Sequence, residues 1–158
     1  MNRVVTGRDE EGNPTIVRRG ASPTVIHAGK YTTTELWVND PEKPSEAGEP
    51  SLSEWSLEPP AGGACFRIVE IAPDDSDGAV EHTGDSEHSA FQETHHTDTL
   101  DFVAVLRGEV TLIVDGSEVT LRAGDSVIQQ PGIPHNWDNR SAEPSVLVGV
   151  LISARAAR

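Results

Sequence analysis

The segment His95-His96-Thr97-Asp98-Thr99-Leu100-Asp101 is followed after six residues by Gly108, and a second group of spaced residues lies further along the chain. This second group comprises Gly124, Gln130-Pro131-Gly132, His135 and Asn139. Imidazole and carboxylate side chains bind metals and transfer protons, and glycines at fixed spacing favour tight turns between strands. The stretch from residue 95 to residue 139 is therefore where we expect the chemistry of the protein.

The composition is that of one acidic domain. The chain has 158 residues, with 26 acidic and 12 basic residues and a formal charge of -14. This length allows one domain with a sizeable core and is short for two. The charge would repel a polyanion and no local basic patch is visible, so we expect no nucleic-acid partner.

Two features predict a location in the cytoplasm. Cys65, the only cysteine, lies in an apolar run and fits a small buried residue in a reducing compartment. Residues 1–12 are charged rather than apolar, and no later segment approaches the roughly 20 apolar residues of a membrane span. We therefore expect no contact with a membrane.

The apolar pattern is that of short strands. We predict strands at residues 31–38, 65–71, 110–114, 119–122, 126–130 and 145–153. Asp115-Gly116 lies between two alternating runs and predicts a hairpin turn. Residues 39–60 and 73–93 are rich in Pro, Glu, Ser and Asp and predict surface loops. Many short antiparallel strands at regular spacing indicate a sandwich or a barrel.

The two groups of spaced residues resemble the paired motifs of the cupin superfamily. Residues in register with those motifs are Gly108, Gly124, Gly132, His135 and Asn139. Three positions depart from the pattern, because Asp101 stands for the usual glutamate, Gln130 for the proline and Thr97 for a histidine. The first motif is most similar to that of small single-domain cupins (cupin type 2, conserved barrel), which reads His-x-Thr-x-Thr-x-Asp followed by an aromatic residue.

This resemblance implies an all-β fold, a double-stranded β-helix or jelly-roll cupin barrel with N-terminal strands and acidic surface loops. A single cupin domain would span residues 1–158. It would comprise N-terminal strands and a Pro/Glu-rich loop at 1–60, a barrel core at 61–153 with motifs at 95–108 and 124–139, and a tail at 154–158. Cupins often pair through exchanged edge strands, so we expect a homodimer, with Arg3 to Val25 as the exchanged segment.

A metal site follows from the same resemblance. His95 and Asp101 share one face of a strand of period two, and His135 would meet them from the second motif. Two imidazoles and one carboxylate would hold one divalent transition metal (Zn, Fe, Mn or Ni) and leave positions open for substrate. In the alternative register His96 is the ligand and Thr94 takes the place of the first histidine, and a β-bulge would let both histidines point inward.

Other polar and aromatic residues are candidates for contact with a substrate. Arg67 shares a strand face with Cys65 and Val69, and an inward guanidinium requires an anionic partner. That partner would be a substrate carboxylate or enolate, or an acid of the protein such as Glu70 or Asp101. Gln129 and Trp137 are placed to contact the substrate, since Trp137 shares the face of His135.

The resemblance implies a metal-dependent enzyme of the lyase or isomerase type in secondary metabolism. The substrate would be a small oxygenated molecule, such as a keto or hydroxy acid, a phenol or a polyketide-like intermediate. Lewis-acid catalysis would support decarboxylation, dehydration, isomerisation or cyclisation, with His96 and Arg67 as catalytic residues that move protons. An iron-dependent dioxygenase and a metal-free small-molecule-binding barrel are the alternatives.

Overall fold

The computed structural model describes residues 2–43, 55–74 and 94–154, and these ranges contain strands and no helix. The predicted all-β fold is confirmed. The strands are β1 (Asn2–Arg8), β2 (Pro14–Ala21), β3 (Val25–Ala28), β4 (Tyr31–Asn39), β5 (Ala64–Ile71), β6 (Thr99–Arg107), β7 (Glu109–Val114), β8 (Ser117–Arg122), β9 (Ser126–Gln129), β10 (Asn136–Asp138) and β11 (Ser145–Ser153).

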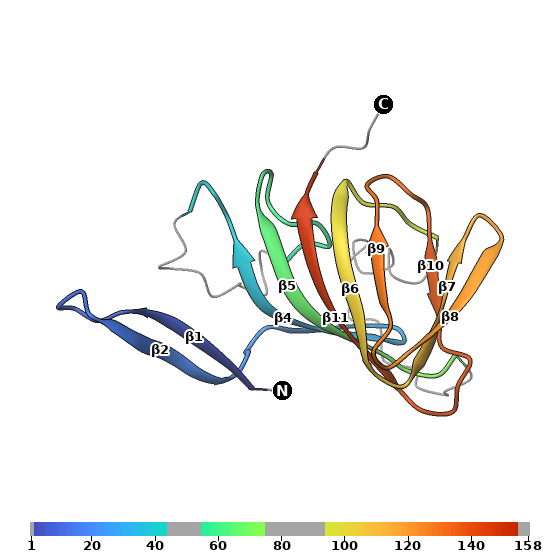
Figure 1. Cartoon of the computed structure of the whole chain (residues 1–158), viewed down its shortest axis with the longest axis horizontal. Helices are drawn as coiled ribbons and strands as arrows, with labels where there is room; N and C mark the ends of the chain where they lie inside the picture. The colour runs from blue at the N-terminus through green and yellow to red at the C-terminus, as the bar shows by residue number, and fades with distance from the viewer. Residues whose placement is uncertain (1, 44–54, 75–93, 155–158) are drawn as a thin grey trace.

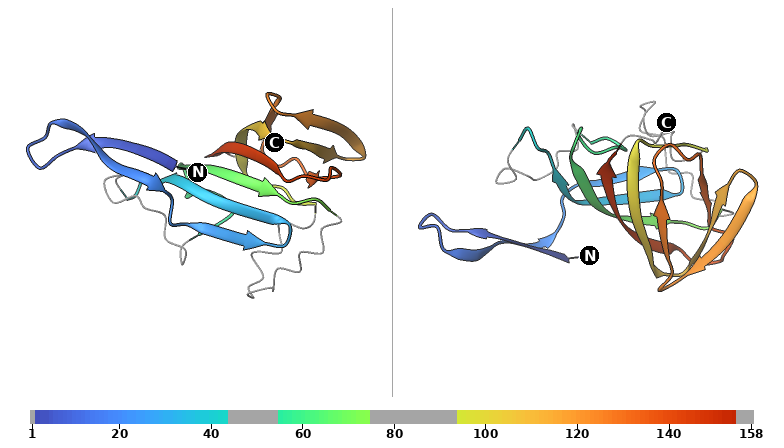
Figure 2. Two further views of the ribbon diagram at one scale, coloured as in Figure 1. Left: turned by 90° about the horizontal axis from the view of Figure 1, so that it is seen from below. Right: turned by 45° about the horizontal axis from the view of Figure 1, so that its top comes forward.

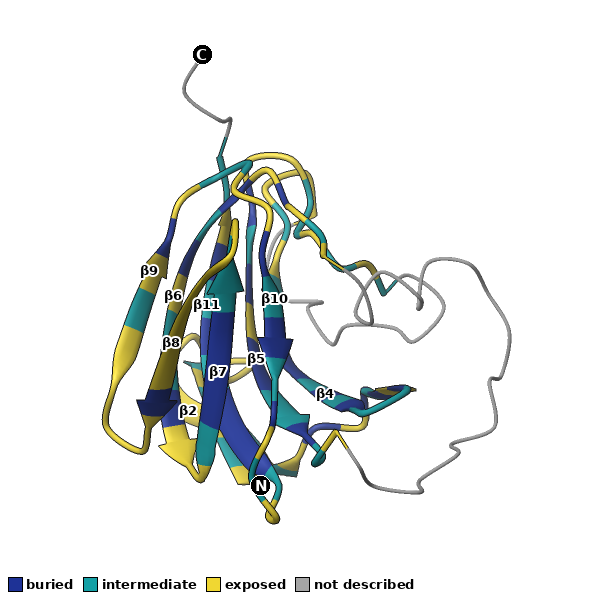
Figure 3. Ribbon diagram, turned by 90° about the vertical axis from the view of Figure 1, so that its right-hand side faces the viewer, coloured by how far each residue is buried: buried dark blue, intermediate teal, exposed yellow. Residues whose placement is uncertain are grey.

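Two antiparallel sheets form the barrel (Figure 1). The larger has the strand order β3-β4-β5-β11-β6-β9, and the smaller has the order β10-β7-β8. Apolar side chains from both sheets fill the space between them, including those of Tyr31, Ile71, Val105, Leu112 and Leu147. Figure 3 shows buried positions along β7 and β11, whereas β8 is exposed along most of its length. This is the jelly-roll arrangement that the motif resemblance implied.

The β7–β8 hairpin shows how the sequence sets a turn. Asp115 and Gly116 have φ angles of 45° and 75°, so both occupy the left-handed region that a two-residue hairpin of type I′ requires. Glycine adopts this conformation without a steric penalty, and aspartate tolerates it better than most residues. The hairpin predicted at these two residues is confirmed. Strand β9 ends at Gln129, one residue before the predicted end.

Strands β1 and β2 form a separate hairpin that extends away from the barrel (Figures 1 and 2). Val4, Ile16 and Val17 are exposed on this hairpin. The hairpin falls within the segment Arg3 to Val25, for which strand exchange in a homodimer is expected, and that expectation stays a prediction. Residues 44–54 and 75–93, which belong to the two predicted surface loops, lie outside the described residues, as do His82 and His88.

Asn139, the last residue of the second motif, ties three segments together at one end of the barrel. Its side chain is fully buried. The Nδ2 amide donates to the carbonyl oxygens of Ile71 (2.8 Å) and Glu143 (2.9 Å). The Oδ1 oxygen accepts from the backbone nitrogen and the hydroxyl of Ser141, at 3.0 and 2.7 Å. Asn139 is therefore a structural residue that fixes the chain between β10 and β11.

We predict that Asn139→Ala lowers the free energy of unfolding by roughly 2–3 kcal/mol, because it leaves buried carbonyls without donors. Urea unfolding followed by circular dichroism measures this change. Asn13→Ala, at an exposed position in the β1–β2 turn, is the control and should change the free energy of unfolding by less than about 0.5 kcal/mol. Equal effects of the two substitutions would contradict this role of Asn139.

Candidate functional site

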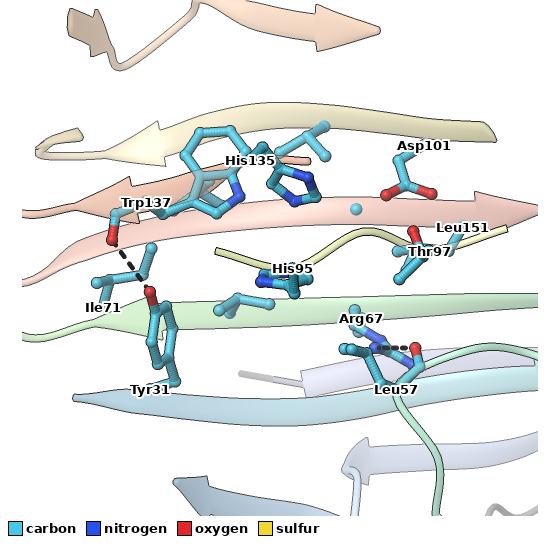
Figure 4. Close-up of a pocket in the computed structure, with 14 residues that line it drawn as sticks. Tyr31, Leu57, Arg67, Ile71, His95, Thr97, Asp101, His135, Trp137 and Leu151 are labelled. Carbon is cyan, nitrogen blue, oxygen red and sulfur yellow. Dashed lines mark hydrogen bonds between the residues drawn. The ribbon is translucent and has the colours of Figure 1, made fainter. Parts of the chain in front are cut away.

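A cavity of about 80 Å³ lies inside the barrel, between the two sheets. It is large enough for a few water molecules or a small organic group. Its lining is apolar at one end, with Tyr31, Ile71 and Trp137, and polar at the other, with Thr97 and Asp101 (Figure 4). The complete lining is Tyr31, Leu57, Arg67, Val69, Ile71, His95, Thr97, Asp101, Val103, His135, Trp137, Leu147, Gly149 and Leu151.

The register of the large sheet explains this polarity. Residues directly opposite each other form rows across the inner face, because side chains alternate along each strand. One row contains Leu151 of β11, Asp101 of β6 and Gln129 of β9. The next row contains Arg67 of β5 and Gly149 of β11. Among the lining residues, the rows further along the strands carry Val69 with Leu147, and then Tyr31 with Ile71.

Gly149 leaves room for the cavity. It lies opposite Arg67 on one side and Val103 on the other. A Cβ atom at this position would contact Leu151 Cδ1 at 3.4 Å and Val103 Cγ2 at 3.7 Å. These are ordinary van der Waals distances, so the glycine is not required by the backbone and its effect is to leave space between two polar rows.

His95 and His135 are joined through their backbones. The His95 nitrogen donates to the His135 oxygen (3.1 Å), and the His135 nitrogen donates to the His95 oxygen (2.9 Å). This single antiparallel bridge connects the segment before β6 with the segment before β10. The two imidazole rings consequently lie side by side in the cavity, with ring centroids 4.4 Å apart.

The ring of His135 has defined hydrogen-bond roles. Nδ1 lies 2.9 Å from the carbonyl oxygen of Ile133, which only accepts, so Nδ1 carries the hydrogen. The side-chain amide nitrogen of Gln129 lies 2.7 Å from both Nδ1 and Nε2, and with the hydrogen on Nδ1 only Nε2 can accept from it. Burial, aided by the nearby His95 and His96 and opposed by the Ile133 hydrogen bond, lowers the pKa of His135 to about 4. His135 is therefore neutral at physiological pH.

Thr97 and Thr99 are buried near Asp101. Their Oγ1 atoms are 2.7 Å apart, and either hydroxyl can donate to the other. The Oδ1 atom of Asp101 is buried and has no hydrogen-bond partner among the residues described. Burial raises the pKa of the Asp101 carboxyl, while the Thr99 hydrogen bond and the charge of Arg67 oppose this shift. The raised pKa makes the Asp101 carboxyl a candidate for proton exchange with a bound molecule.

Arg67 contacts the protein rather than an open site. Its Nη2 atom lies 2.8 Å from Glu35 Oε2 in a buried ion pair, and its Nη1 atom donates to the Leu57 oxygen at 3.0 Å. Trp55 Nε1 also donates to Glu35 Oε2, at 3.1 Å. The prediction that Arg67 points inward is correct, and among the alternative partners the structure shows an acid of the protein, Glu35, which the sequence did not single out. The pair holds residues 55–58 in place, so that Leu57 forms one wall of the cavity.

The other predicted site residues divide into two groups. His95, Asp101, His135 and Trp137 line the cavity. Gln129 is buried behind His135 and reaches the site only through its hydrogen bond to that ring. His96 is exposed and is not among the lining residues, because it has the opposite parity to His95 and Thr97. The structure therefore offers no support for His96 as a group that moves protons in the cavity.

The predicted metal ligands do not form a complete set. Among the described residues no three His, Cys, Asp or Glu side chains are grouped closely enough to hold a metal ion. The imidazoles of His95 and His135 are adjacent, but Asp101 lies at the polar end of the cavity beside Thr97 (Figure 4). The Nε2 atom of His135 already accepts a hydrogen bond from Gln129. The three-ligand arrangement thus does not fit this structure.

Sequence comparison identifies a known domain in part of the chain. Residues 85–151 match the family model "Cupin domain". These residues are a cupin domain. The match includes both motifs, so the positions of Asp101, His135 and Asn139 are cupin motif positions in a cupin barrel.

Two proteins of Diaporthe leptostromiformis are similar to this chain over most of its length. They are "Phomopsin biosynthesis cluster protein C'" and "Phomopsin biosynthesis cluster protein D". Each is 29% identical over 155 residues, a region that covers 89% of this chain and 71% of the relative. The relatives connect this sequence with proteins of a biosynthesis cluster.

Solved structures agree on the fold. A Cupin 2 conserved barrel domain protein from Salinispora arenicola is 16% identical with a TM-score of 0.54, covering 90% of this chain and 92% of the other. The Cnp3 cupin domain of Schizosaccharomyces pombe is 9% identical with a TM-score of 0.52, covering 96% and 87% of the two chains. At these identities the likeness concerns the barrel alone. Within the described residues, no helix has the length and apolar character needed to cross a membrane.

The neutral state of His135 predicts a pH dependence of stability. The pKa of His135 is about 4 in the folded protein and 6.5 for an unperturbed histidine, so the unfolded state binds more protons between these values. Stability is therefore complete above pH 6.5 and falls as the pH decreases towards 4, by on the order of 3 kcal/mol. Urea unfolding at several pH values measures this, and His135→Gln should reduce the slope. His27→Gln, at an exposed histidine, is the control, and an equal reduction there would contradict the assignment.

The positions of the three predicted ligands also predict how metal affinity responds to substitution. We expect His95→Ala and His135→Ala each to weaken the binding of added Zn²⁺ or Ni²⁺, and Asp101→Asn to leave it within about twofold, because only the two imidazoles are adjacent. Isothermal titration calorimetry on the whole chain measures the affinities. A loss in Asp101→Asn as large as that in His135→Ala would show that the carboxylate joins the metal site.

Proposed function

We propose that this cupin binds a small oxygenated molecule of secondary metabolism in its barrel cavity and catalyses a proton-transfer reaction on it. The observation that carries the proposal is the buried Oδ1 atom of Asp101, which has no hydrogen-bond partner among the described residues and belongs to a residue lining the cavity. A buried unpaired carboxyl oxygen is costly, so its presence favours a role in contact with a ligand. Similarity to two phomopsin biosynthesis cluster proteins supports the connection with secondary metabolism.

The shape and polarity of the cavity support a small and mostly apolar ligand. Trp137, Ile71 and Val69 form a surface for an apolar part, while Thr97 and Asp101 form a polar end. Pockets of this kind bind organic molecules through apolar contact and orient them through a few polar groups. Leu57, held by Arg67, limits the space on one side.

Asp101 has the properties of a general acid and base. Its burial raises the pKa of the carboxyl, which brings proton uptake closer to neutral pH. In a dehydration, the carboxylate takes a proton from the carbon next to a carbonyl, and the electrons of the broken C–H bond form the new C=C bond. The neighbouring C–O bond breaks, and Asp101 returns the proton to the leaving oxygen to give water. Isomerisation and cyclisation use the same proton removal with a different acceptor.

Metal-dependent chemistry, whether Lewis-acid catalysis or dioxygenation by iron, is the second candidate function. The adjacent imidazoles of His95 and His135 are the observation in its favour. Metal binding would require Asp101 or another donor to approach these rings. It would also require the hydrogen bond between Gln129 and His135 Nε2 to break. The metal-free binding barrel is the third candidate, and it predicts binding without turnover.

The probe 4-hydroxybutan-2-one, which carries a carbonyl and a β-hydroxyl, separates these candidates. We expect the protein to accelerate deuterium exchange at carbon 3 and loss of water to the enone, measured by NMR in D₂O. Asp101→Asn should reduce both rates by roughly 100-fold, in the range of general acid–base effects. Asp98→Asn, at an exposed acid three residues earlier, should leave both unchanged.

Three other outcomes would redirect the proposal. Binding of the probe without exchange would favour the metal-free binding barrel. Rates that appear only with an added divalent metal, and that are lost in His135→Ala, would favour Lewis-acid catalysis. Consumption of oxygen with added Fe²⁺ would favour the dioxygenase.

A further inference from the structure

We propose that the outer face of the large sheet binds a second copy of this chain, which lays its β1–β2 hairpin across an exposed row of apolar side chains. Two copies related by a two-fold axis exchange their hairpins in this way, so each copy supplies one hairpin and one sheet face. This contact gives the homodimer expected from the sequence a defined surface. It lies on the outside of the barrel and is independent of the function proposed for the cavity.

A row of apolar side chains crosses the outer face of the large sheet. Its members lie opposite one another on neighbouring strands from β4 to β9, and they are Trp37, Phe66, Val150, Phe102 and Ile128. Their sequence neighbours Arg67 and Asp101 line the cavity, so the alternation of side chains points the row outward. Phe66, Phe102 and Ile128 are 41%, 43% and 56% exposed, so the row is not covered by the described part of this chain.

The rows on either side extend this apolar surface. On one side Leu100 lies opposite Ile152, and on the other Ile68 lies opposite Val148. An antiparallel sheet that packs one face on the core commonly carries polar residues on its other face. The outer face here is apolar across β5, β11 and β6 instead. A contiguous exposed apolar surface of this kind marks a site of interaction with another molecule.

The β1–β2 hairpin carries a second exposed apolar surface. Val4 and Thr6 share one face of β1, and Thr6 lies opposite Ile16 of β2, so Val4 and Ile16 are presented together. They are 62% and 43% exposed. A two-stranded hairpin is at best marginally stable in water without a further surface to pack on, and this one extends away from its own barrel (Figures 1 and 2). The outer face of a second copy supplies that surface.

The distribution of charge favours a second copy as the occupant. Strands β1 and β2 contain four of the 12 basic residues of the chain and none of its 26 acidic residues. The rest of the chain is therefore strongly acidic and attracts the hairpin of another copy. On the outer face, Glu70 has the same parity as Phe66 and is half-exposed, and its contact with Arg107 is 3.6 Å long. Glu70 is thus accessible to an arginine of the incoming hairpin.

The size of the two surfaces is that of a stable interface. Stable protein interfaces contain about 20–30 residues on each partner. The hairpin strands have 7 and 8 residues, and the outer face of the large sheet contributes side chains from five strands. Because two-fold symmetry places one hairpin and one face of each copy in the interface, the exchange brings both surfaces of each copy into contact.

Sedimentation velocity of the whole chain over a range of concentrations tests the interface. We expect a dimer at micromolar concentration. Phe102→Glu on the sheet face and Val4→Glu on the hairpin should each raise the dissociation constant of the dimer by at least roughly 30-fold, because each introduces an unpaired charge into an apolar contact. Ser117→Glu, which adds the same charge at an exposed position on the small sheet, is the control and should change the dissociation constant by less than about twofold.

A mixture of the two interface variants tests the exchange itself. In a dimer of Phe102→Glu alone, or of Val4→Glu alone, both hairpin–face contacts contain a glutamate. In a mixed dimer, the intact hairpin of the Phe102→Glu copy meets the intact face of the Val4→Glu copy, so one contact is restored. We expect the mixture to associate at least roughly fivefold more tightly than either variant alone, since a restored contact recovers part of the apolar burial. Circular dichroism checks that each variant is folded, and the unsubstituted protein is informative even if one is not.

Three results would overturn this interface. A monomer at every soluble concentration would show that the outer face is covered by another part of the chain or by a different partner. A dimer that neither Phe102→Glu nor Val4→Glu weakens would use another surface. A dimer that Phe102→Glu weakens and Val4→Glu does not, with no recovery in the mixture, would pair the two sheet faces without exchange of the hairpins.

Discussion

Two backbone hydrogen bonds between His95 and His135 are the contact on which the site depends. They connect the segment entering β6 of the large sheet to the segment entering β10 of the small sheet, and a further bond from the Gly132 nitrogen to the Thr97 oxygen (2.8 Å) continues the connection. Backbone pairing fixes residue parity, so it decides which side chains face the interior. If the pairing shifted by one residue, His96 would replace His95 inside and Thr97 would leave the cavity.

The buried ion pair of Arg67 and Glu35 organises the opposite side of the cavity. Removing either partner would leave an uncompensated buried charge, so the pair is strongly coupled to the fold whatever its net contribution to stability. Through Arg67 the strands β4 and β5 are linked to the backbone of residues 56 and 57. Arg67, which the sequence predicted to be catalytic, therefore positions Leu57 in the wall of the cavity. Its positive charge is paired with Glu35.

The sequence predicted the direction of side chains better than their partners. Period-two alternation and the cupin motifs placed Arg67, Asp101 and Trp137 inside, and the structure agrees. The partner of Arg67 was not predictable, because Glu35 lies 32 residues away on β4 and a register shift between Glu35 and Trp37 interrupts the alternation there. Spacing likewise suggested that Asp101 joins His95 and His135, whereas the distance between them depends on how the two sheets meet. The distance between side chains on different sheets cannot be predicted from the residues that surround each of them in a single sequence.

Asn139 and Asp101 differ in how completely their buried polar atoms are hydrogen-bonded. Both are buried motif residues, but each Asn139 side-chain polar atom is bonded within the protein, while Asp101 has one oxygen without a partner among the described residues. An unsatisfied buried acceptor costs about 1–3 kcal/mol. Asp101 therefore carries a cost to the fold that Asn139 does not. Burial also raises the pKa of its carboxyl, so the same residue that lowers stability is the one whose proton equilibrium lies closest to a catalytic role.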